Sequence, residues 1–293
     1  LFDLLIAQSK AYQNILLPGY THFQVAMPSS FGMWFSAYAE TLIDDVTLLN
    51  AALTVADQNP LGSAAGYGSS FPIDRTFTTQ EMGFATLKYN SVAAQMSRGK
   101  VEKTTAFALA SVAGTLSKLA MDITLYLSQN FNFISLPQHL TTGSSIMPHK
   151  KNPDIFELIR GKCNKIQALP YEITLITNNL PSGYHREFQL LKEGLFPALQ
   201  TLKSCLEMAH YSIKEINVNE NILDDKKYDY LFTVDALNEL VTQGVPFRDA
   251  YKIVGGQVDE GTFVSPKATN HTHEGSINNL CLDEIVAKMQ KAL

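Results

Sequence analysis

Cysteine is scarce in this chain of 293 residues, and the three that it has, Cys163, Cys205 and Cys281, are far apart. An odd number of widely spaced cysteines, none in a C-x-x-C pair, argues against a disulfide framework and a cysteine zinc site. It favours packed, reduced thiols and therefore a cytoplasmic protein. A basic excess is lacking too, since the formal net charge is −5, which argues against a nucleic-acid partner.

Long hydrophobic runs are also missing. We find no apolar run of the roughly 18 residues that a membrane span requires, so we expect no membrane partner. The N-terminus has neither the basic region nor the small-residue cleavage site of a secretory signal. With 45% hydrophobic and 17% charged residues, the composition is that of an ordinary globular protein.

The chain does contain long apolar stripes at helical spacing. Apolar residues recur at steps of three and four in segments at about 29–56, 91–131, 154–179 and 188–213, with a kink expected at Pro170. Stripes this long exceed the average helix of about 11–12 residues and are typical of a bundle. No alternating strand pattern is present. The sequence therefore predicts an all-α fold, with part of the apolar surface meeting other subunits.

Two domains are expected. Residues 1–213 would form a central helical bundle, and residues 214–293, where short helical patterns alternate with Asn, Asp, Gly and Pro, a small C-terminal helical domain. Residues 1–16 have the pattern of the later part of a helix and no cap before them. We therefore expect that sequence is missing upstream.

One loop stands out between the second and third stripes, at residues 143–153, with the sequence G-S-S-I-M-P-H-K-K-N-P. Its prolines and glycine exclude helix and interior strand. A helix is expected to start directly after it, with Asn152 as its cap and Pro153 at its first position. Because the loop is cationic and ends at a helix N-terminus, it is suited to hold a carboxylate.

The loop matches every fixed position of the signature G-S-S-x-M-P-x-K-x-N-P and so resembles the fumarase/aspartase superfamily of lyases. Residues 18–24, P-G-Y-T-H-F-Q, resemble the P-G-Y-T-H-x-Q motif of the argininosuccinate lyases within it. The resemblance implies a long-helix bundle of the fumarase/aspartase type and a homotetramer whose active sites are shared among three subunits. It also implies cleavage of 2-(Nω-L-arginino)succinate to fumarate and L-arginine in arginine biosynthesis, with no cofactor and no metal.

Breaking a C–N bond beta to a carboxylate requires a base, donors at the carboxylate and an acid for the leaving nitrogen. The resemblance implies that Ser144 is the base, with Lys150 and the loop amides available to stabilise its alkoxide. Lys150 and Asn152 match positions that bind the substrate carboxylate, and Ser145 would be a neighbouring contact.

His22 lies in the second motif, and in the family this histidine pairs with a glutamate that Glu157 matches. A carboxylate bonded to one imidazole nitrogen fixes the tautomer and raises the basicity of the other, so His22 would exchange protons with the substrate. Whether it is the acid that complements Ser144 stays open. Thr21 and Gln24 match substrate-contact positions.

A third segment, P-S-G-Y at residues 181–184, resembles the family's substrate-binding segment. Tyr184 and Gln189 would bond the amino-acid end of the substrate, and Lys192 would pair with a carboxylate. Two departures affect substrate contacts. Leu190 and Leu191 stand where acidic residues are usual, and the S-x-R-D motif appears as S-R-G-K at residues 97–100, so that Arg98 would replace the usual arginine at a shifted position.

Two alternatives remain. Adenylosuccinate lyases of the same superfamily often read M-P-H-K, as His149 does here, although the P-G-Y-T-H-x-Q segment argues against them. A non-catalytic helical protein is the second, because this fold also serves as a lens crystallin and the S-R-N-D-Q motif of the family is not found.

His271 and His273 could suggest a metal site. The two histidines alone lack the third ligand that a catalytic zinc needs, so we expect no metal there.

Overall fold

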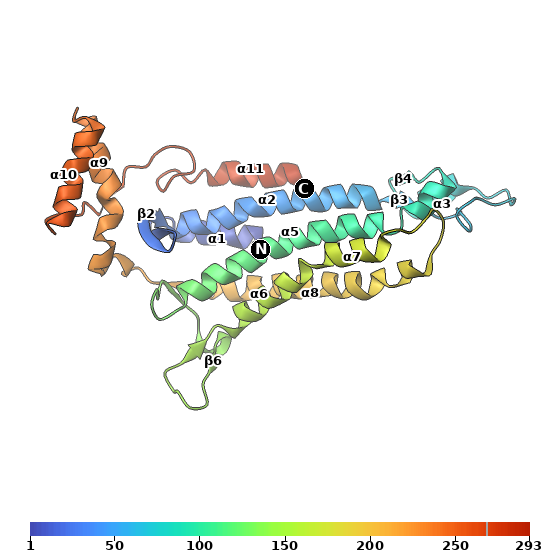
Figure 1. Cartoon of the computed structure of the whole chain (residues 1–293), viewed down its shortest axis with the longest axis horizontal. Helices are drawn as coiled ribbons and strands as arrows, with labels where there is room; N and C mark the ends of the chain where they lie inside the picture. Colours follow the sequence, from blue (N-terminus) through green and yellow to red (C-terminus); the bar gives the residue numbers. More distant parts are fainter. Residues whose placement is uncertain (268) are drawn as a thin grey trace. The chain divides into compact units, whose positions relative to one another are not determined.

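The structure, a computed structural model, describes residues 1–267 and 269–293 and is mostly helical (Figure 1). This confirms the all-α class. The chain forms two compact units. The first unit comprises residues 1–40, 125–140 and 212–288, and the second comprises residues 41–124, 141–211 and 289–293.

The first unit combines an N-terminal helix, a β-hairpin, short helices and the ends of longer helices. Its elements are α1 (Phe2–Ala11), β1 (Leu16–Thr21), β2 (Gln24–Ser30), the start of α2 (Phe31–Ala56), the end of α5 (Lys100–Tyr126), β5 (Ile134–Ser135), η1 (Gln138–Leu140), the end of α8 (Leu191–Lys214), β8 (Asn217–Val218), η3 (Ile222–Asp224), η4 (Lys226–Phe232), α9 (Thr233–Thr242), α10 (Phe247–Asp259) and most of α11 (Leu282–Ala292).

The hairpin of β1 and β2 was not expected from the sequence. The strands pair antiparallel with Thr21 opposite Gln24, so the connection is only two residues long. Both turn residues, His22 and Phe23, have positive φ, 52° and 57°. A two-residue turn of this kind matches the twist of the strands, but it is usually made by Asn-Gly or Asp-Gly. Pro18 pairs with Pro28; such prolines are tolerated because both strands are edge strands.

Aromatic rings anchor strand β1 of the hairpin to the first unit. The Tyr20 ring lies edge-on to Phe131, with 5.2 Å between centroids, and its hydroxyl donates to the Tyr228 hydroxyl at 3.2 Å. Burial and the Tyr228 hydroxyl raise the pKa of Tyr20 well above its usual range. Leu17 and Phe133 are buried in the same region. The strands are therefore fixed while the turn stays exposed.

The second unit contains the long helices and the signature loop. Its elements are the rest of α2, β3 (Gln58–Asn59), α3 (Arg75–Glu81), β4 (Thr86–Leu87), α4 (Ser91–Met96), most of α5, β6 (Thr142–Gly143), β7 (Lys151–Asn152), α6 (Asp154–Ile166), α7 (Leu169–Thr177), η2 (Arg186–Gln189) and most of α8.

The predicted stripes form much of the core of the second unit. The buried positions of α6 and α7 recur at helical spacing, at Phe156, Ile159, Ile166, Leu169 and Ile173. The third stripe is interrupted between Ile166 and Leu169, because Pro170 lacks an N–H and its ring would clash with the carbonyl four residues earlier. The predicted kink is thus present as a break, with Pro170 in the first turn of α7.

The second stripe is likewise divided. Helix α4 ends at Met96 and α5 starts at Lys100. Gly99, between them, has a φ of +84°, and a Cβ there would lie 2.6 Å from Cγ2 of Thr177. Only glycine fits this backbone conformation and this approach of α7.

The stretch Ser91–Tyr126 is long and apolar enough to span a membrane by length and composition, which corrects the expectation that no stretch would pass that test. More than half of the window is buried inside the protein, as is usual for a core helix. It is therefore weak support for a membrane span.

The C-terminal helices α9 and α10 have a small core of their own. Leu237, Ala250 and Val254 are buried, and Val245 and Phe263 pack against them. His271 bonds to Asp235 through Nε2 at 2.6 Å, and His273 Nδ1 contacts the Glu274 carbonyl at 3.1 Å. The predicted domain boundary at residue 213 stays a prediction.

Two of the three cysteines are buried, and all three are free thiols. Burial, with Cys205 as a neighbour, raises the pKa of the Cys163 thiol to about 12. Cys163 is therefore a protonated, packed thiol at neutral pH.

We expect Gly99→Ala to lower the free energy of unfolding by about 1–3 kcal/mol, because alanine is strained at positive φ and its Cβ meets Thr177. The matched control is Gly114→Ala, also on α5, where the nearest atom would be 3.6 Å from the new Cβ. That change should stabilise the helix by about 0.5–1 kcal/mol. Urea denaturation followed by circular dichroism measures both. Equal stabilities of the two variants would contradict the conclusion that only glycine fits at position 99.

Candidate functional site

The signature loop is the connection of a short hairpin in the second unit. Strand β6 pairs with β7, Thr142 opposite Asn152 and Gly143 opposite Lys151, which leaves residues 144–150 as the loop. The Ser144 Oγ, half-buried, accepts hydrogen bonds from the backbone N–H groups of Ile146 and Met147, at 3.3 and 3.1 Å. Two N–H donors aimed at one hydroxyl oxygen can also stabilise negative charge on it.

The helix behind the loop begins at Asp154, so the prediction that Pro153 occupies its first position is wrong by one residue, and its cap also differs. The N-cap residue is Pro153, with no side-chain cap bond, so the prediction that Asn152 caps the helix is wrong. Asn152 Nδ2 instead donates to the Thr142 hydroxyl at 3.4 Å, and that hydroxyl donates to the Asp154 carboxylate. These bonds close the neck of the loop, which diverts Asn152 from the helix end.

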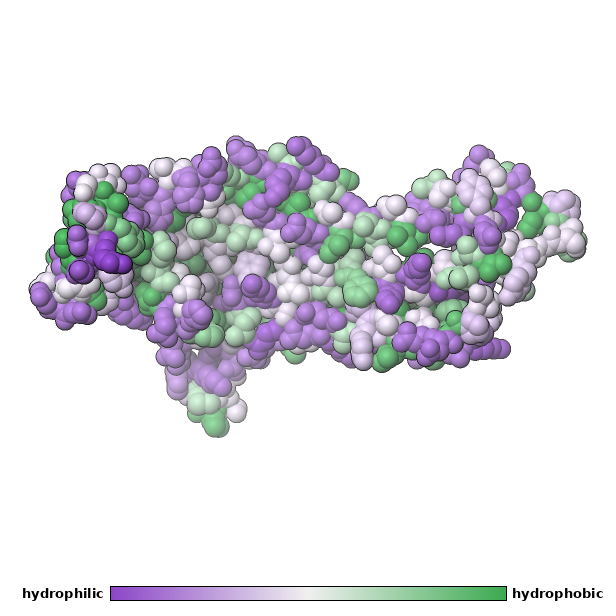
Figure 2. Space-filling view, turned by 45° about the horizontal axis from the view of Figure 1, so that its top comes forward, coloured by the Kyte–Doolittle hydropathy of each residue, from purple (hydrophilic) through white to green (hydrophobic). Residues whose placement is uncertain are grey.

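The loop itself is open to solvent. Four of its side chains are exposed: Ser145, His149, Lys150 and Lys151. Neither the histidine nor the two lysines form an ion pair with a residue that the structure describes. Ile146 is 82% exposed. Figure 2 shows hydrophobic atoms, in green, at the free end of this projecting loop. A free cationic loop with two serine hydroxyls can bind a carboxylate.

Glu157 lies on the first turns of α6 and is exposed. Its predicted partner His22, with Thr21 and Gln24, belongs to the hairpin of the first unit, where all three side chains are exposed. The pairing of His22 with Glu157 stays a prediction.

The third predicted segment lies between α7 and α8. Gln189 Nε2 donates to the Tyr184 hydroxyl at 2.6 Å, so these two predicted substrate contacts are brought together. Lys192 is exposed near the start of α8. Leu191, at one of the two departures from the family, is 2% exposed and belongs to the core, whereas Leu190 is 46% exposed.

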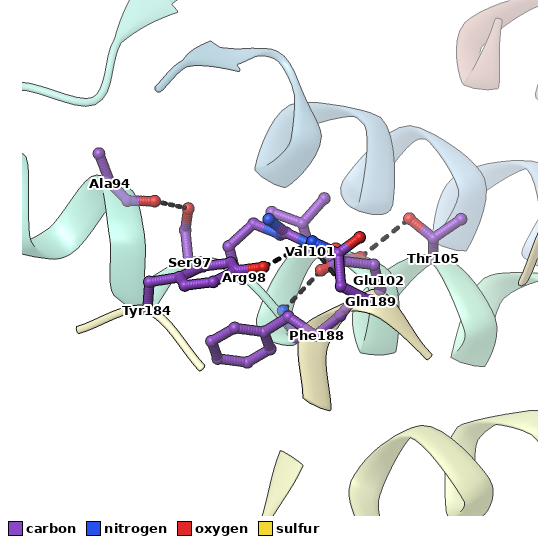
Figure 3. Close-up of polar contacts among 10 residues, drawn as sticks. Ala94, Ser97, Arg98, Val101, Glu102, Thr105, Tyr184, Phe188 and Gln189 are labelled. Atoms are coloured by element: carbon purple, nitrogen blue, oxygen red, sulfur yellow. Dashed lines mark hydrogen bonds and ion pairs between the residues drawn. The ribbon is translucent and has the colours of Figure 1, made fainter. Parts of the chain in front are cut away.

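Arg98 holds this segment from the side of α5 (Figure 3). Its Nη2 donates to the Phe188 carbonyl at 3.3 Å, and its guanidinium lies 5.5 Å from the centre of the Phe188 ring. Glu102 accepts from Arg98 Nε at 3.4 Å and from the Gly99 N–H at 2.6 Å. We call Arg98, Glu102 and Phe188 the arginine clamp. In this arrangement the Arg98 guanidinium contacts protein groups and not a substrate. Such a role suits a residue that positions the segment with Tyr184 and Gln189.

Glu102 and Thr142 were not predicted from the sequence. For Glu102 a signal exists, because an arginine and a glutamate four residues apart on a helix face each other. For Thr142 we see no such signal, since its partners depend on the pairing of β6 with β7.

The signature loop and the segment with Tyr184, both in the second unit, lie at opposite ends of the run of α6 and α7 (Figure 1). Residues 154–177, in α6 and α7, separate the signature loop from the segment with Tyr184. At 1.5 Å per residue this helical run is roughly 35 Å long. One copy of the chain therefore does not bring Ser144 and Tyr184 to the same small substrate.

A family model described as "Lyase" matches residues 1–168, more than half of the chain. The chain belongs to this lyase family. Over all 293 residues it is 60% identical to an argininosuccinate lyase of Bacteroides thetaiotaomicron, of which it covers 66%. It is 36% identical over 286 residues, 97% of the chain, to an argininosuccinate lyase of Xylella fastidiosa, of which it covers 64%. The chain thus spans about 66% of the length of the Bacteroides relatives, and the predicted resemblance to argininosuccinate lyases is confirmed.

The fold is similar to that of a solved EDDS lyase, with a TM-score of 0.82 and 18% sequence identity, over 99% of this chain and 66% of that one. A class II fumarase from Schistosoma mansoni matches with a TM-score of 0.75 and 18% identity, over 100% of this chain and 64% of that one. These similarities confirm the predicted bundle of the fumarase/aspartase type.

We expect Arg98→Gln to loosen residues 186–190, because it removes both the stacking on Phe188 and the charge-assisted bond to its carbonyl. Amide hydrogen exchange of this segment should accelerate about tenfold. Arg186→Gln is the control, since Arg186 is exposed in the same segment and bonds no described side chain. Unchanged exchange in Arg98→Gln would show that the arginine clamp does not hold this segment.

Proposed function

We propose that this chain is part of an argininosuccinate lyase, a carbon–nitrogen lyase that splits 2-(Nω-L-arginino)succinate into fumarate and L-arginine. The supporting observation is 60% identity, across the whole chain, to curated proteins of that name. The role would be arginine biosynthesis in the cytoplasm, which agrees with the free thiols.

Ser144 is proposed as the base that removes the proton next to the substrate carboxylate. A serine alkoxide needs stabilisation, and the N–H groups of Ile146 and Met147 already point at its oxygen. Lys150 adds a positive charge on the same loop, and Lys150, Asn152 and Ser145 would hold the carboxylate, where negative charge grows in the transition state. Excluding water around the loop would strengthen each of these interactions.

His22 and Glu157 are proposed as the second proton-transfer pair, with Thr21 and Gln24 as contacts beside them. His22 lies at the exposed turn of a hairpin that Tyr20 anchors, and its imidazole forms no hydrogen bond with a residue that the structure describes. A carboxylate from Glu157 would orient it.

A homotetramer with shared active sites is the proposed assembly. The separation of roughly 35 Å along α6 and α7 requires a second copy to complete the site. Several apolar side chains of the long helices are also exposed although they belong to the predicted stripes: Leu53 at 62%, Phe107 at 56% and Leu199 at 41%. Such surface is typical of helices that pack against another subunit. Tyr184, Gln189 and Lys192 of one copy would then meet the signature loop of another.

The natural protein that contains this chain should release fumarate from argininosuccinate, measured by the ultraviolet absorbance of fumarate. Adenylosuccinate is the comparison substrate, because His149 fits the M-P-H-K pattern of that enzyme. Fumarate from adenylosuccinate alone would reverse the assignment. Release from neither substrate would favour a non-catalytic, crystallin-like role.

Ser144→Ala should reduce kcat at least about 10³-fold while argininosuccinate still binds, because the base is lost and the carboxylate contacts remain. Ser145→Ala is the matched comparison one residue away, and it should raise KM more than it lowers kcat. Single-turnover kinetics with calorimetric binding separate the two effects. Near-normal turnover in Ser144→Ala would remove Ser144 from the mechanism.

A further inference from the structure

A cavity of about 440 Å³ lies in the second unit beside the arginine clamp. Its walls come from the start of α5, the end of α7 and the segment that follows α7. The volume is within the range of roughly 300–1,000 Å³ that is usual for small-molecule sites. Tyr184, Gln189 and Lys192 do not line it. Arg98, which the sequence predicted as a substrate contact, and Ser182, of the P-S-G-Y segment, do line it, so the cavity adjoins the proposed substrate contacts.

Two lysines give this cavity its charge. Lys100 and Lys103 both line it, three residues apart on α5 and therefore on one face of the helix. Neither forms an ion pair with a residue that the structure describes. Arg98 also lines the cavity, but its charge is balanced by Glu102. Among the described lining residues none is acidic, so two positive charges face the cavity uncompensated.

The remaining lining groups suit a compact, hydrogen-bonding ligand. Ser182 and Thr104 contribute hydroxyls, and Phe188 contributes an apolar wall. Among the described residues, the Ser182 Oγ has only the weak acceptor Met96 Sδ as its partner, at 3.6 Å. The Thr104 hydroxyl donates to the Lys100 carbonyl at 2.8 Å. Ser182 can thus turn its proton toward a stronger acceptor in the cavity.

We propose that this cavity binds a small dianion, with Lys100 and Lys103 as its charge partners and Ser182 as a donor. Two ammonium groups match two negative charges, which phosphate and a short dicarboxylate both carry. The two lysines are absent from the proposed catalytic set, so the site does not require the lyase activity. Because Arg98 and Phe188 form one wall, a bound dianion would contact the arginine clamp that holds the segment with Tyr184 and Gln189.

Calorimetric titration of the full-length protein with inorganic phosphate, and separately with succinate, tests the site at low ionic strength. We expect saturable binding of at least one of them at millimolar concentrations or below. Lys100→Gln/Lys103→Gln should weaken that binding about tenfold or more, and added potassium chloride should weaken it in the unmodified protein. Binding of phosphate alone would assign the site to phosphate-bearing ligands, and binding of succinate alone to dicarboxylates.

The matched control is Lys118→Gln/Lys203→Gln, which removes the same total charge from exposed positions outside the cavity. It should bind like the unmodified protein. Three results would overturn the proposal: no saturable binding of either anion, equal binding in Lys100→Gln/Lys103→Gln, or an equal loss in the control. Circular dichroism checks folding, and Lys103→Gln alone replaces the double variant if that does not fold. Succinate held at the proposed catalytic loop would persist in the double variant, which separates this outcome from the lyase proposal.

Discussion

The length of the helical run between the signature loop and the Tyr184 segment constrains the candidate site more than any single contact. Helices α6 and α7 carry the signature loop at one end and lead to the Tyr184 segment at the other. A path of roughly 35 Å cannot close around one small substrate. In the proposed assembly, a second copy would bring its signature loop to the Tyr184 segment of the first. Exposed Phe107 and Leu199 on the long helices supply apolar surface for such packing.

The helices could be predicted from the sequence because their apolar residues report burial directly. Ile159 and Ile166 of α6, and Leu191, Leu195 and Leu202 of α8, belong to the predicted stripes and are buried. The hairpin could not, because its strands contain Pro18, Gly19 and Pro28 and do not alternate. What stabilises it is distant in sequence, as the contacts of Tyr20 with Phe131 and Tyr228 demonstrate. Periodicity carries no information on such contacts.

The candidate residues could be named from the sequence by resemblance, but their local settings could not. Asn152 looked like a helix cap and instead bonds Thr142, because the pairing of β6 with β7 brings that hydroxyl close. Arg98 was expected to contact substrate, and its guanidinium is occupied by Glu102 and Phe188. The glycine that follows it looked like a departure from a motif. In the structure it permits the approach of Thr177, which lets α5 begin beside the segment that Arg98 holds.

The same division between anchor and free end recurs at the hairpin turn and the signature loop. His22 and Phe23 occupy left-handed backbone positions, which cost roughly 1–2 kcal/mol each for residues other than glycine. Asn-Gly would fit this turn with less strain, so local stability does not explain its sequence. In the hairpin, the contacts of Tyr20 anchor the strands and offset that cost. In the signature loop, the bonds among Thr142, Asn152 and Asp154 close the neck in a similar way. Both elements thereby present exposed polar groups on anchored strands, which suits the proposed site.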